Sequence, residues 1–309
     1  MARAFVTGVT GYIGGSVARR LRQGGYGVKG LVRTPADGER IAALGIEPVV
    51  GRLEDAPLLS RLAREADVVV NAASAGHRGA VEALVEGLRG TNKTLVHTSG
   101  SAIVADVGEG EPSEHIFEDD TPFTPVPAKA ARVALDRFVR DSAREGIRSM
   151  VICPSMIYGR GLGVKRDSAQ VPRLLQESSR RQAGVHLGRG LNVWSNVHIE
   201  DLVELYSLAI AQAKPGDFFF AESGEARFVD IAVSLSRILG FGGRTFAWAL
   251  PEASAALGED WARYILASNS RVRATHARRL GWKPKHTSVL REIEEGSYRE
   301  DFASHALAK

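Results

Sequence analysis

The sequence predicts an α/β protein built on a doubly wound parallel sheet with helices on both faces, followed by a smaller C-terminal lobe. Two observations lead to this prediction. In the first half of the chain, short apolar runs alternate strictly with segments of helical periodicity. The runs are apolar throughout rather than at every second residue, which is typical of strands buried on both faces of a parallel sheet.

The first strand and the first helix are the clearest elements. Residues 3–7 form an apolar run that is followed by a glycine, which predicts a buried strand. Between residues 12 and 23, apolar side chains recur every four positions, as on one face of a helix. The two glycines at 24–25 then end that helix.

The next elements repeat this alternation as far as residue 152. Further strands are predicted at residues 28–32, 48–50, 68–70, 95–97 and 150–152. Further helices are predicted in the segment that ends at Gly45 and at residues 58–66, 79–88 and 128–144. A loop rich in Pro, Glu and Asp, at 108–127, precedes the last of these helices.

After Pro154 the pattern loosens. Periodicity predicts helices at residues 171–181, 199–213, 228–239 and 270–280, and an aromatic run predicts a strand at 218–220. All four tryptophans lie in this half, at positions 194, 248, 261 and 282. This clustering suits a smaller lobe that forms a pocket against the first, and core packing is the alternative explanation.

The composition is that of a globular protein with a sizeable core. Of the 309 residues, 44% are hydrophobic and 25% charged, which excludes collagen-like, disordered and disulfide-scaffold classes. The 40 basic residues outnumber the 36 acidic ones, but they are scattered, so no nucleic-acid partner is expected. The densest basic stretch, residues 271–285, is expected to be a solvated helix face and the turn after it.

Cysteine usage and hydropathy indicate the compartment. The single cysteine, Cys153, cannot form an internal disulfide, which favours a reducing environment. No apolar run reaches the roughly 18 residues of a membrane span, and the N-terminus does not resemble a signal peptide. We therefore expect a soluble, cytoplasmic protein with no membrane partner. The histidines and the cysteine lack metal-ligand spacing, so no metal site is expected.

The turn between the first strand and the first helix carries the strongest motif. Gly8 allows a tight turn, Gly11 lets backbone approach a pyrophosphate, and Gly14 allows close contact between helix and strand. The free N–H groups at the start of the helix would then bind phosphate. A glycine-rich turn without a ligand is the alternative. The predicted cofactor contacts from this turn are Gly8, Thr10, Gly11, Tyr12, Ile13 and Gly14.

This glycine spacing resembles the extended and atypical branches of the short-chain dehydrogenase/reductase superfamily, the NAD-dependent epimerase/dehydratase type. Five further segments resemble motifs of that family and follow in the same order. They are Gly51-Arg52-Leu53-Glu54-Asp55, Asn71-Ala72-Ala73, Cys153-Pro154-Ser155-Met156-Ile157-Tyr158-Gly159, Asn196-Val197-His198-Ile199-Glu200-Asp201 and Gly281-Trp282-Lys283-Pro284.

The resemblance implies a Rossmann domain over residues 1–155, to which 190–220 return, and a substrate-binding lobe over most of 156–309. It implies a small-molecule substrate and a homodimer formed through the helix at 128–144. The further cofactor contacts that it implies are Arg52, Leu53, Ala72, Ala73, Thr98, Arg132 and Pro154.

The chain departs from the family at the catalytic positions. Members carry Tyr-x-x-x-Lys on the helix after the fifth strand, but here Ala128 stands at the tyrosine position and Arg132 at the lysine position. Gly100 stands where the catalytic serine or threonine usually lies, with a serine on either side.

We therefore predict a substitute catalytic set. Ser101, or alternatively Ser99, would donate a hydrogen bond to the substrate oxygen, and Tyr158 would supply the proton directly or through water. The alternative is that Tyr158 only packs and water supplies the proton. With Tyr158 as the acid, replacing it by Phe would lower kcat by roughly 10²–10⁴.

The second strand predicts the cofactor. An NAD-specific site usually carries a carboxylate at its end, whereas this chain has Arg33, whose guanidinium can pair with a 2′-phosphate. We therefore predict NADP, with NAD as the alternative if Arg33 only stacks on adenine. The expected activity is NADP(H)-dependent reduction of a small carbonyl-like substrate. The alternatives are a sugar-nucleotide epimerase-like enzyme and a non-catalytic dinucleotide-binding sensor.

Overall fold

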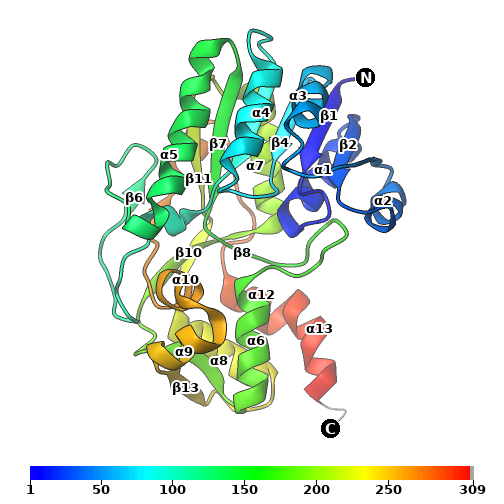
Figure 1. Cartoon of the computed structure of the whole chain (residues 1–309). Helices are drawn as coiled ribbons and strands as arrows, with labels where there is room; N and C mark the ends of the chain where they lie inside the picture. The colour runs from blue at the N-terminus through cyan, green and yellow to red at the C-terminus, as the bar shows by residue number, and fades with distance from the viewer. Residues whose placement is uncertain (307–309) are drawn as a thin grey trace.

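A computed structural model describes residues 1–306, with side chains described through Phe302. Within this range, seven strands form a parallel sheet in the order β11-β7-β5-β4-β1-β2-β3 (Figure 1). Their bounds are β1 Arg3–Thr7, β2 Gly27–Val32, β3 Glu47–Val50, β4 Val68–Asn71, β5 Thr94–Thr98, β7 Arg148–Pro154 and β11 Asp217–Ala221. The strand order reverses between β1 and β4, as in a doubly wound sheet. The predicted fold class is confirmed.

Helices cover both faces of this sheet because its strands are apolar on both sides. One face packs against α1 (Tyr12–Gln23), α2 (Pro35–Ala42) and α7 (Ile199–Gln212). The other face packs against α3 (Ala56–Glu65), α4 (Arg78–Leu88) and α5 (Pro127–Asp141). Short helical turns come after β5, at η1 (Ser101–Val104), and after α5, at η2 (Ser142–Glu145). The carboxyl ends of the strands therefore meet at one edge between the two helical layers.

The smaller lobe has its own core. One sheet joins β8 (Met156–Tyr158), β10 (Val193–His198) and β12 (Gly224–Arg227), and β9 (Gly184–Leu187) pairs with β13 (Thr245–Trp248). The helical elements of this lobe are α6 (Gln170–Arg181), α8 (Phe228–Ile238), α9 (Leu250–Leu257), α10 (Glu259–Trp261), η3 (Ala262–Leu266), α12 (Val289–Glu295) and α13 (Ser297–Ala306). Each of the four tryptophans packs into or against a hydrophobic core.

The chain crosses between the lobes more than once. It leaves the large sheet after β7, passes through β8 to β10 in the smaller lobe, and returns as α7 and β11. Helix α7 packs beside α1, and β11 pairs with β7 at the edge of the large sheet (Figure 1). Strand β8 itself contacts two cores, because Met156 and Tyr158 are buried in that of the smaller lobe and Ile157 packs against that of the large sheet.

Only the second half of the helix predicted at 270–280 is helical. It forms a short helix, α11 (Thr275–Arg279), and the residues before it form a short strand, β14 (Val272–Arg273). Strand β14 pairs with β6 (Phe117–Glu118), inside the segment expected to be loop. The carboxylate of Asp119 accepts hydrogen bonds of 2.8 Å from the Thr275 hydroxyl and the His276 amide, which holds the start of α11.

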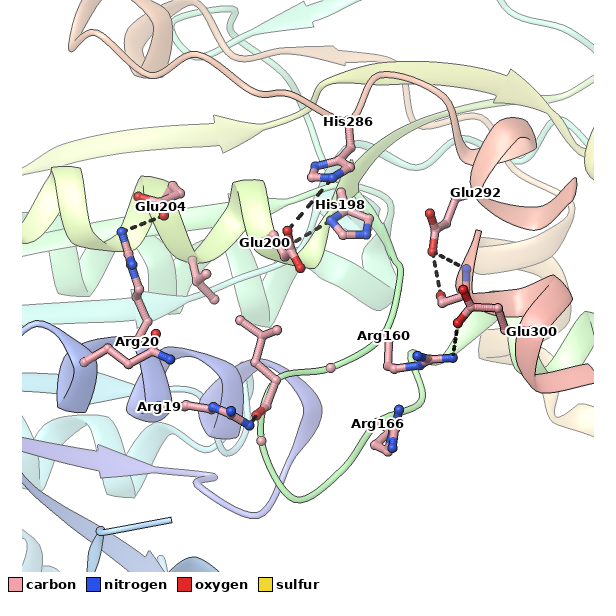
Figure 2. Close-up of a pocket in the computed structure, with 16 residues that line it drawn as sticks. Arg19, Arg20, Arg160, Arg166, His198, Glu200, Glu204, His286, Glu292 and Glu300 are labelled. Atoms are coloured by element: carbon pink, nitrogen blue, oxygen red, sulfur yellow. Dashed lines mark hydrogen bonds and ion pairs between the residues drawn. The ribbon is translucent and has the colours of Figure 1, made fainter. Parts of the chain in front are cut away.

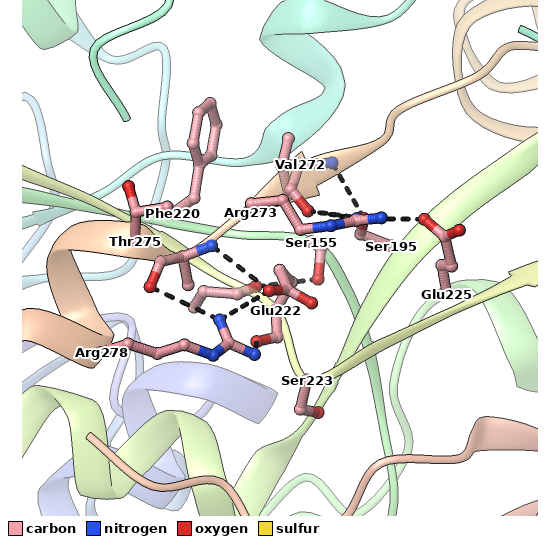
Figure 3. A network of polar contacts seen from close by, with 12 residues as sticks. Ser155, Ser195, Phe220, Glu222, Ser223, Glu225, Val272, Arg273, Thr275 and Arg278 are labelled. Atoms are coloured by element: carbon pink, nitrogen blue, oxygen red, sulfur yellow. Dashed lines mark hydrogen bonds and ion pairs between the residues drawn. The ribbon is translucent and has the colours of Figure 1, made fainter. Parts of the chain in front are cut away.

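On α11 the arginines Arg278 and Arg279 are exposed, as expected of a solvated helix face, but several basic residues of the segment also form ion pairs. The guanidinium of Arg278 contacts the buried Glu222 carboxylate at 2.6 Å (Figure 3). Arg271 and Arg273 pair with Glu225 at 2.8 and 3.0 Å. These charges therefore join the C-terminal segment to β12 and the residues before it. Among the described residues, the helices are too short or too polar for a membrane span.

Candidate functional site

The glycine-rich turn brings three backbone segments into direct contact. Gly8 has a φ of +71°, and a Cβ built on it would lie 2.5 Å from the carbonyl oxygen of Ala72. A Cβ on Gly14 would lie 2.3 Å from the Gly8 carbonyl oxygen. The turn closes through the Gly11 amide, which donates to the Gly8 carbonyl at 2.8 Å. These positions accept only glycine without a shift of the backbone.

The turn opens onto a cleft at the carboxyl edge of the sheet. No described side chain caps the start of α1, so its first amides remain free to bind an anion. The cleft has a volume of about 720 Å³. Its lining residues are Gly8, Thr10, Gly11, Leu31, Val32, Arg33, Thr34, Gly51, Arg52, Leu53, Glu54, Ala72 and Ala73. Eight of the predicted cofactor residues are thus brought together by β1, β2, β4 and the loop after β3.

The charged groups of this cleft come from two loops. Arg33 follows β2 directly and is exposed, and Arg52 lies in the loop after β3. The Glu54 carboxylate that also lines the cleft lies 3.3 Å from Nε2 of His77. Asp37, the first carboxylate after β2, belongs to α2, where it accepts a hydrogen bond from the Thr34 hydroxyl. The end of β2 therefore presents an arginine to the cleft.

Three predicted contacts of the turn lie outside this cleft lining. The hydroxyl of Tyr12 lies 2.8 Å from the carbonyl oxygen of Gly159 and 3.0 Å from that of Tyr158, so it joins α1 to the segment after β8. Ile13 packs against the core beneath the sheet. Gly14 contacts the Gly8 carbonyl rather than the cleft. These three residues therefore hold the turn in place without lining the cleft.

The predicted hydroxyl groups at the end of β5 are buried and differ in their partners. The Ser101 hydroxyl is 2.8 Å from that of Ser270, and Ser101 is 1% exposed. The Thr98 hydroxyl lies 2.6 Å from that of Tyr206. Ser99 instead donates to the Asp136 carboxylate at 2.6 Å. The position of Ser101 therefore does not support its expected contact with substrate.

Tyr158 lies in the core of the smaller lobe. Its side chain is fully buried and its hydroxyl donates to the carbonyl oxygen of His286 at 3.1 Å. Burial raises the pKa of this phenol well above its ordinary value. Both the position and the acidity of Tyr158 are thus unsuited to the expected role of proton source.

The structure reveals a buried polar network that the sequence analysis missed. The Thr7 hydroxyl donates to Oδ1 of Asn71 at 2.6 Å, and Nδ2 of Asn71 donates to Nδ1 of His97 at 3.0 Å. Nε2 of His97 faces Oδ1 of Asp136 at 3.5 Å, and the other carboxylate oxygen accepts from Ser99. In the sequence, this network could have been found from polar residues at positions expected to be in the core. These are His97, within a strand, and Asp136, on the apolar face of α5.

Comparison with known proteins identifies the family of this chain. The NAD dependent epimerase/dehydratase family matches residues 4–219. The chain belongs to this family. The chain is 30% identical to an oxidase, ucsJ, of Acremonium sp, over 94% of this chain and 95% of that protein.

Other relatives agree with this family. A 4-hydroxy-2-methyl-3-oxo-4-farnesyl-3,4-dihydroquinoline-1-oxide ketoreductase of Stigmatella aurantiaca is 28% identical, over 72% of this chain and 68% of its own length. A dTDP-glucose 4,6-dehydratase of Bacillus anthracis, solved in complex with NAD, is 17% identical with a TM-score of 0.75, covering 100% of this chain and 97% of that one. The latter likeness shows the fold, and the sequence relatives place the chain with oxidoreductases.

The positions expected for the tyrosine and the lysine lie on α5. Ala128 is exposed at the position expected for tyrosine. Arg132, one turn later, is half-buried, and its Nη1 lies 3.6 Å from where a Cβ on Gly100 would stand. Pro154 ends β7, and the neighbouring Cys153 is fully buried, which raises the pKa of its thiol. Cys153 is therefore a core residue and not a nucleophile.

Burial sets the protonation of the missed network. It raises the pKa of Asp136 to about 7, against the opposing effects of the Ser99 hydrogen bond and of Arg132 and Arg140. Burial, together with Arg132, lowers the pKa of His97 to about 4. His97 is therefore uncharged at neutral pH, and Asp136 keeps its proton to a higher pH than an exposed carboxyl group would.

A second cleft, of about 760 Å³, lies between α1, α7 and the segment after β8 (Figure 2). His198, Glu200 and His286 meet there, with one ligand atom of each within 4.8 Å of the others. The two imidazole rings stack with centroids 3.9 Å apart, and Nδ1 of His198 accepts from the Glu200 amide. These three side chains form a cluster of possible metal ligands that the histidine spacing in the sequence does not reveal, and its two rings form a stacked pair.

Proposed function

We propose that the protein is an NADP(H)-dependent oxidoreductase that reduces a small carbonyl compound. The observation that carries this proposal is Arg33 at the end of β2, in the cleft formed by the glycine turn. A guanidinium there suits the 2′-phosphate of NADP, whereas a carboxylate would suit the free ribose of NAD. The named activities of the relatives, an oxidase and a ketoreductase, support the redox assignment.

The residues present fit such a cofactor. The close approach of Gly8 to Ala72 and of Gly14 to Gly8 packs the turn tightly beside the cleft, and a Cβ at either position would overlap backbone atoms. The uncapped amides of α1 would hold the pyrophosphate, and Arg33 and Arg52 would face the adenosine end.

The chain contributes position and a proton route to the reaction. The nicotinamide, when bound, supplies the hydride. Arg132 offers a fixed positive charge for the ribose in place of the family lysine. Ser99 is the predicted hydroxyl that is bonded to an ionisable group, and we assign it the hydrogen bond to the substrate oxygen.

Cofactor titration of the purified protein tests the assignment of Arg33. A titration followed by tryptophan fluorescence should show a lower dissociation constant for NADPH than for NADH. Arg33→Ala should weaken NADPH binding about tenfold or more, because a charge-assisted contact contributes roughly 1.5–3 kcal/mol. Arg40→Ala, an exposed arginine of α2 that pairs with Asp37, is the matched control and should leave both affinities unchanged. Equal affinities for NADPH and NADH in the unmutated protein would contradict the proposal.

A dinucleotide sensor is the second candidate, favoured by Ala128 at the tyrosine position. An absorbance assay of NADPH oxidation with a panel of ketones, aldehydes and nucleotide sugars separates the two. Turnover of a ketone or an aldehyde supports the reductase. Epimerisation consumes no NADPH overall, so the nucleotide sugars are also followed by chromatography of the products. Conversion of nucleotide sugars alone supports the epimerase-like alternative, and tight binding without any conversion supports the sensor.

A further inference from the structure

The contact between Ser99 and Asp136 joins the end of β5 to a buried carboxyl group. The two side chains come from different elements, and their oxygens are 2.6 Å apart. Ser99 is 7% exposed and Asp136 is 4% exposed. Burying an ionised carboxylate with a single hydroxyl donor costs folding free energy, and this cost is smaller when the group holds a proton part of the time.

The other carboxyl oxygen of Asp136 is unsatisfied. Among the described residues, neither Oδ1 of Asp136 nor Nε2 of His97 has a hydrogen-bond partner, although the two atoms face each other at 3.5 Å. Nδ1 of His97 accepts from Asn71, which fixes the ring as the Nε2–H tautomer. His97 is neutral at physiological pH because burial lowers its pKa, so it gives the carboxylate no positive charge.

The charged and titratable groups around Asp136 come from each element packed against it. They are Arg132 and Arg140 on α5, His97 on β5, Cys153 on β7 and Asp119 in the loop before α5. The two arginines favour the charged carboxylate, but burial outweighs them. The balance leaves a carboxyl group that gains and loses a proton near neutrality.

Asp136 also borders a second space. A cavity of about 250 Å³ lies between α5, the loop at 119–123 and β11, and Asp136 is among its lining residues. A cavity of this volume with polar lining groups can hold several water molecules. Among the other lining residues are Asp119, Asp120, Arg137 and Arg140. The carboxyl group therefore lies between the Ser99 hydroxyl and a space from which a proton can return.

The neighbouring groups that could give a proton are engaged elsewhere. Tyr158 donates to the His286 carbonyl inside the smaller lobe, and the Ser101 hydroxyl pairs with Ser270. The buried Lys129 pairs with Asp260 and lies 5.3 Å from the ring of Tyr264, so its ammonium group points toward α10.

We propose that Asp136 supplies the proton for the substrate oxygen through the Ser99 hydroxyl, in place of the tyrosine that this chain lacks. The inference rests on the proposed reductase function. In the protonated state the carboxyl O–H donates to Oγ of Ser99, and the Ser99 O–H donates to the substrate oxygen. As the carbonyl carbon accepts the hydride, its oxygen takes the Ser99 proton and Ser99 takes the carboxyl proton. Asp136 is left as a carboxylate, and water in the adjoining cavity returns its proton.

The titration of Asp136 can be tested without any substrate. Infrared difference spectra of the purified protein, recorded across a pH series, should show a protonated-carboxyl band that disappears around pH 7. Asp136→Asn should abolish this band. Ser99→Ala should shift the transition to higher pH, because it removes the hydroxyl that stabilises the carboxylate. The matched control, Asp141→Asn, changes an exposed acid at the end of the same helix and should leave the band unchanged.

Two outcomes of the titration would overturn the inference. One is an Asp136 carboxyl group that is fully ionised throughout the series. The other is a transition that Ser99→Ala leaves in place. Both results are independent of turnover, so they are distinguishable from a failure of the proposed function, which would show as intact titration with no carbonyl compound reduced.

The pH profile of turnover gives the second test, with the carbonyl compound that the panel identifies. The kcat for reduction should fall above about pH 7 as Asp136 ionises. Asp136→Asn should lower kcat by roughly 10²-fold or more, lose this pH limb and keep its NADPH affinity. Asp141→Asn should keep the original profile. An Asp136→Asn variant with the kcat and the pH limb of the unmutated protein would overturn the proposal.

Discussion

The two ends of the candidate site are built in different ways. At the glycine turn, the geometry depends on backbone atoms alone, with Gly8 against Ala72 and Gly14 against Gly8. At the end of β5, it depends on side chains from separate elements, with Ser99 held by Asp136 of α5. The first arrangement tolerates almost no substitution, while the second can exchange one proton donor for another and keep the fold.

This difference explains why the family resemblance is strong at one end and weak at the other. A phosphate bound by backbone amides requires glycines at fixed spacing, whatever the substrate. A proton can be delivered by any group of suitable pKa within reach of the reacting oxygen. The glycine turn is therefore the clearer mark of the family, and the proposed catalytic end is where we expect this chain to differ.

The largest effect is expected at the backbone end. Gly8→Ala should destabilise the protein by about 3–5 kcal/mol, of which roughly 1–2 come from the left-handed φ and the rest from overlap with the Ala72 carbonyl. NADPH binding should fall below detection. Gly25→Ala is the control, because Gly25 has a φ of +85° but no described atom within 4 Å of its Cβ position. Urea unfolding that showed equal losses for both variants would remove the steric argument.

A smaller, pH-dependent effect is expected at the side-chain end. Because the pKa of Asp136 is raised from 3.8 to about 7, the folded state holds this proton more tightly than the unfolded state. The stabilisation is complete below about pH 4 and is lost as the pH rises to about 7. Asp136→Asn should therefore be more stable than the unmutated protein at pH 8, by on the order of 2–4 kcal/mol, and show no such gain at pH 4.

Denaturant midpoints at the two pH values measure this difference, with Asp141→Asn as the control for loss of a surface charge. An Asp136→Asn variant that is destabilised equally at both pH values would show that the buried carboxylate is satisfied, and the contrast between the two ends would weaken.

The smallest effect is expected for Tyr158. Tyr158→Phe removes one hydrogen bond to the His286 carbonyl and should cost about 1 kcal/mol in unfolding free energy. The kcat on any substrate found should stay unchanged, in contrast to the loss of 10²–10⁴ expected of a proton donor. A loss of that size with normal folding would restore Tyr158 as the acid.

The predictability of each region from sequence follows the range of the interactions that form it. The apolar runs and helical periods of residues 1–152 are local signals, and the sheet they predict is present. The helix expected at 270–280 is divided because Asp119, far away in the chain, holds the start of α11. The short strands β9 and β13 of the smaller lobe pair with each other although they are far apart in the sequence, so no local pattern marks them.

The candidate site follows the same rule. The glycine spacing and Arg33 are adjacent in the sequence to the strands that place them, and they line one cleft. His97 and Asp136 lie on separate elements and become neighbours only through the packing of α5 against the sheet. Ser101 and Tyr158 were predicted from residue type and family position, without knowledge of the partners that occupy their hydroxyls.

The Tyr12 hydroxyl has a consequence for the order in which ligands are expected to add. Tyr12 opens α1, directly after the turn that would hold the dinucleotide, and it bonds to Gly159 at the junction with the smaller lobe. A ligand that fixes the turn would therefore also fix the junction with the smaller lobe, where we expect the second ligand to bind. The expected kinetic scheme is compulsory order, with the dinucleotide adding first and leaving last.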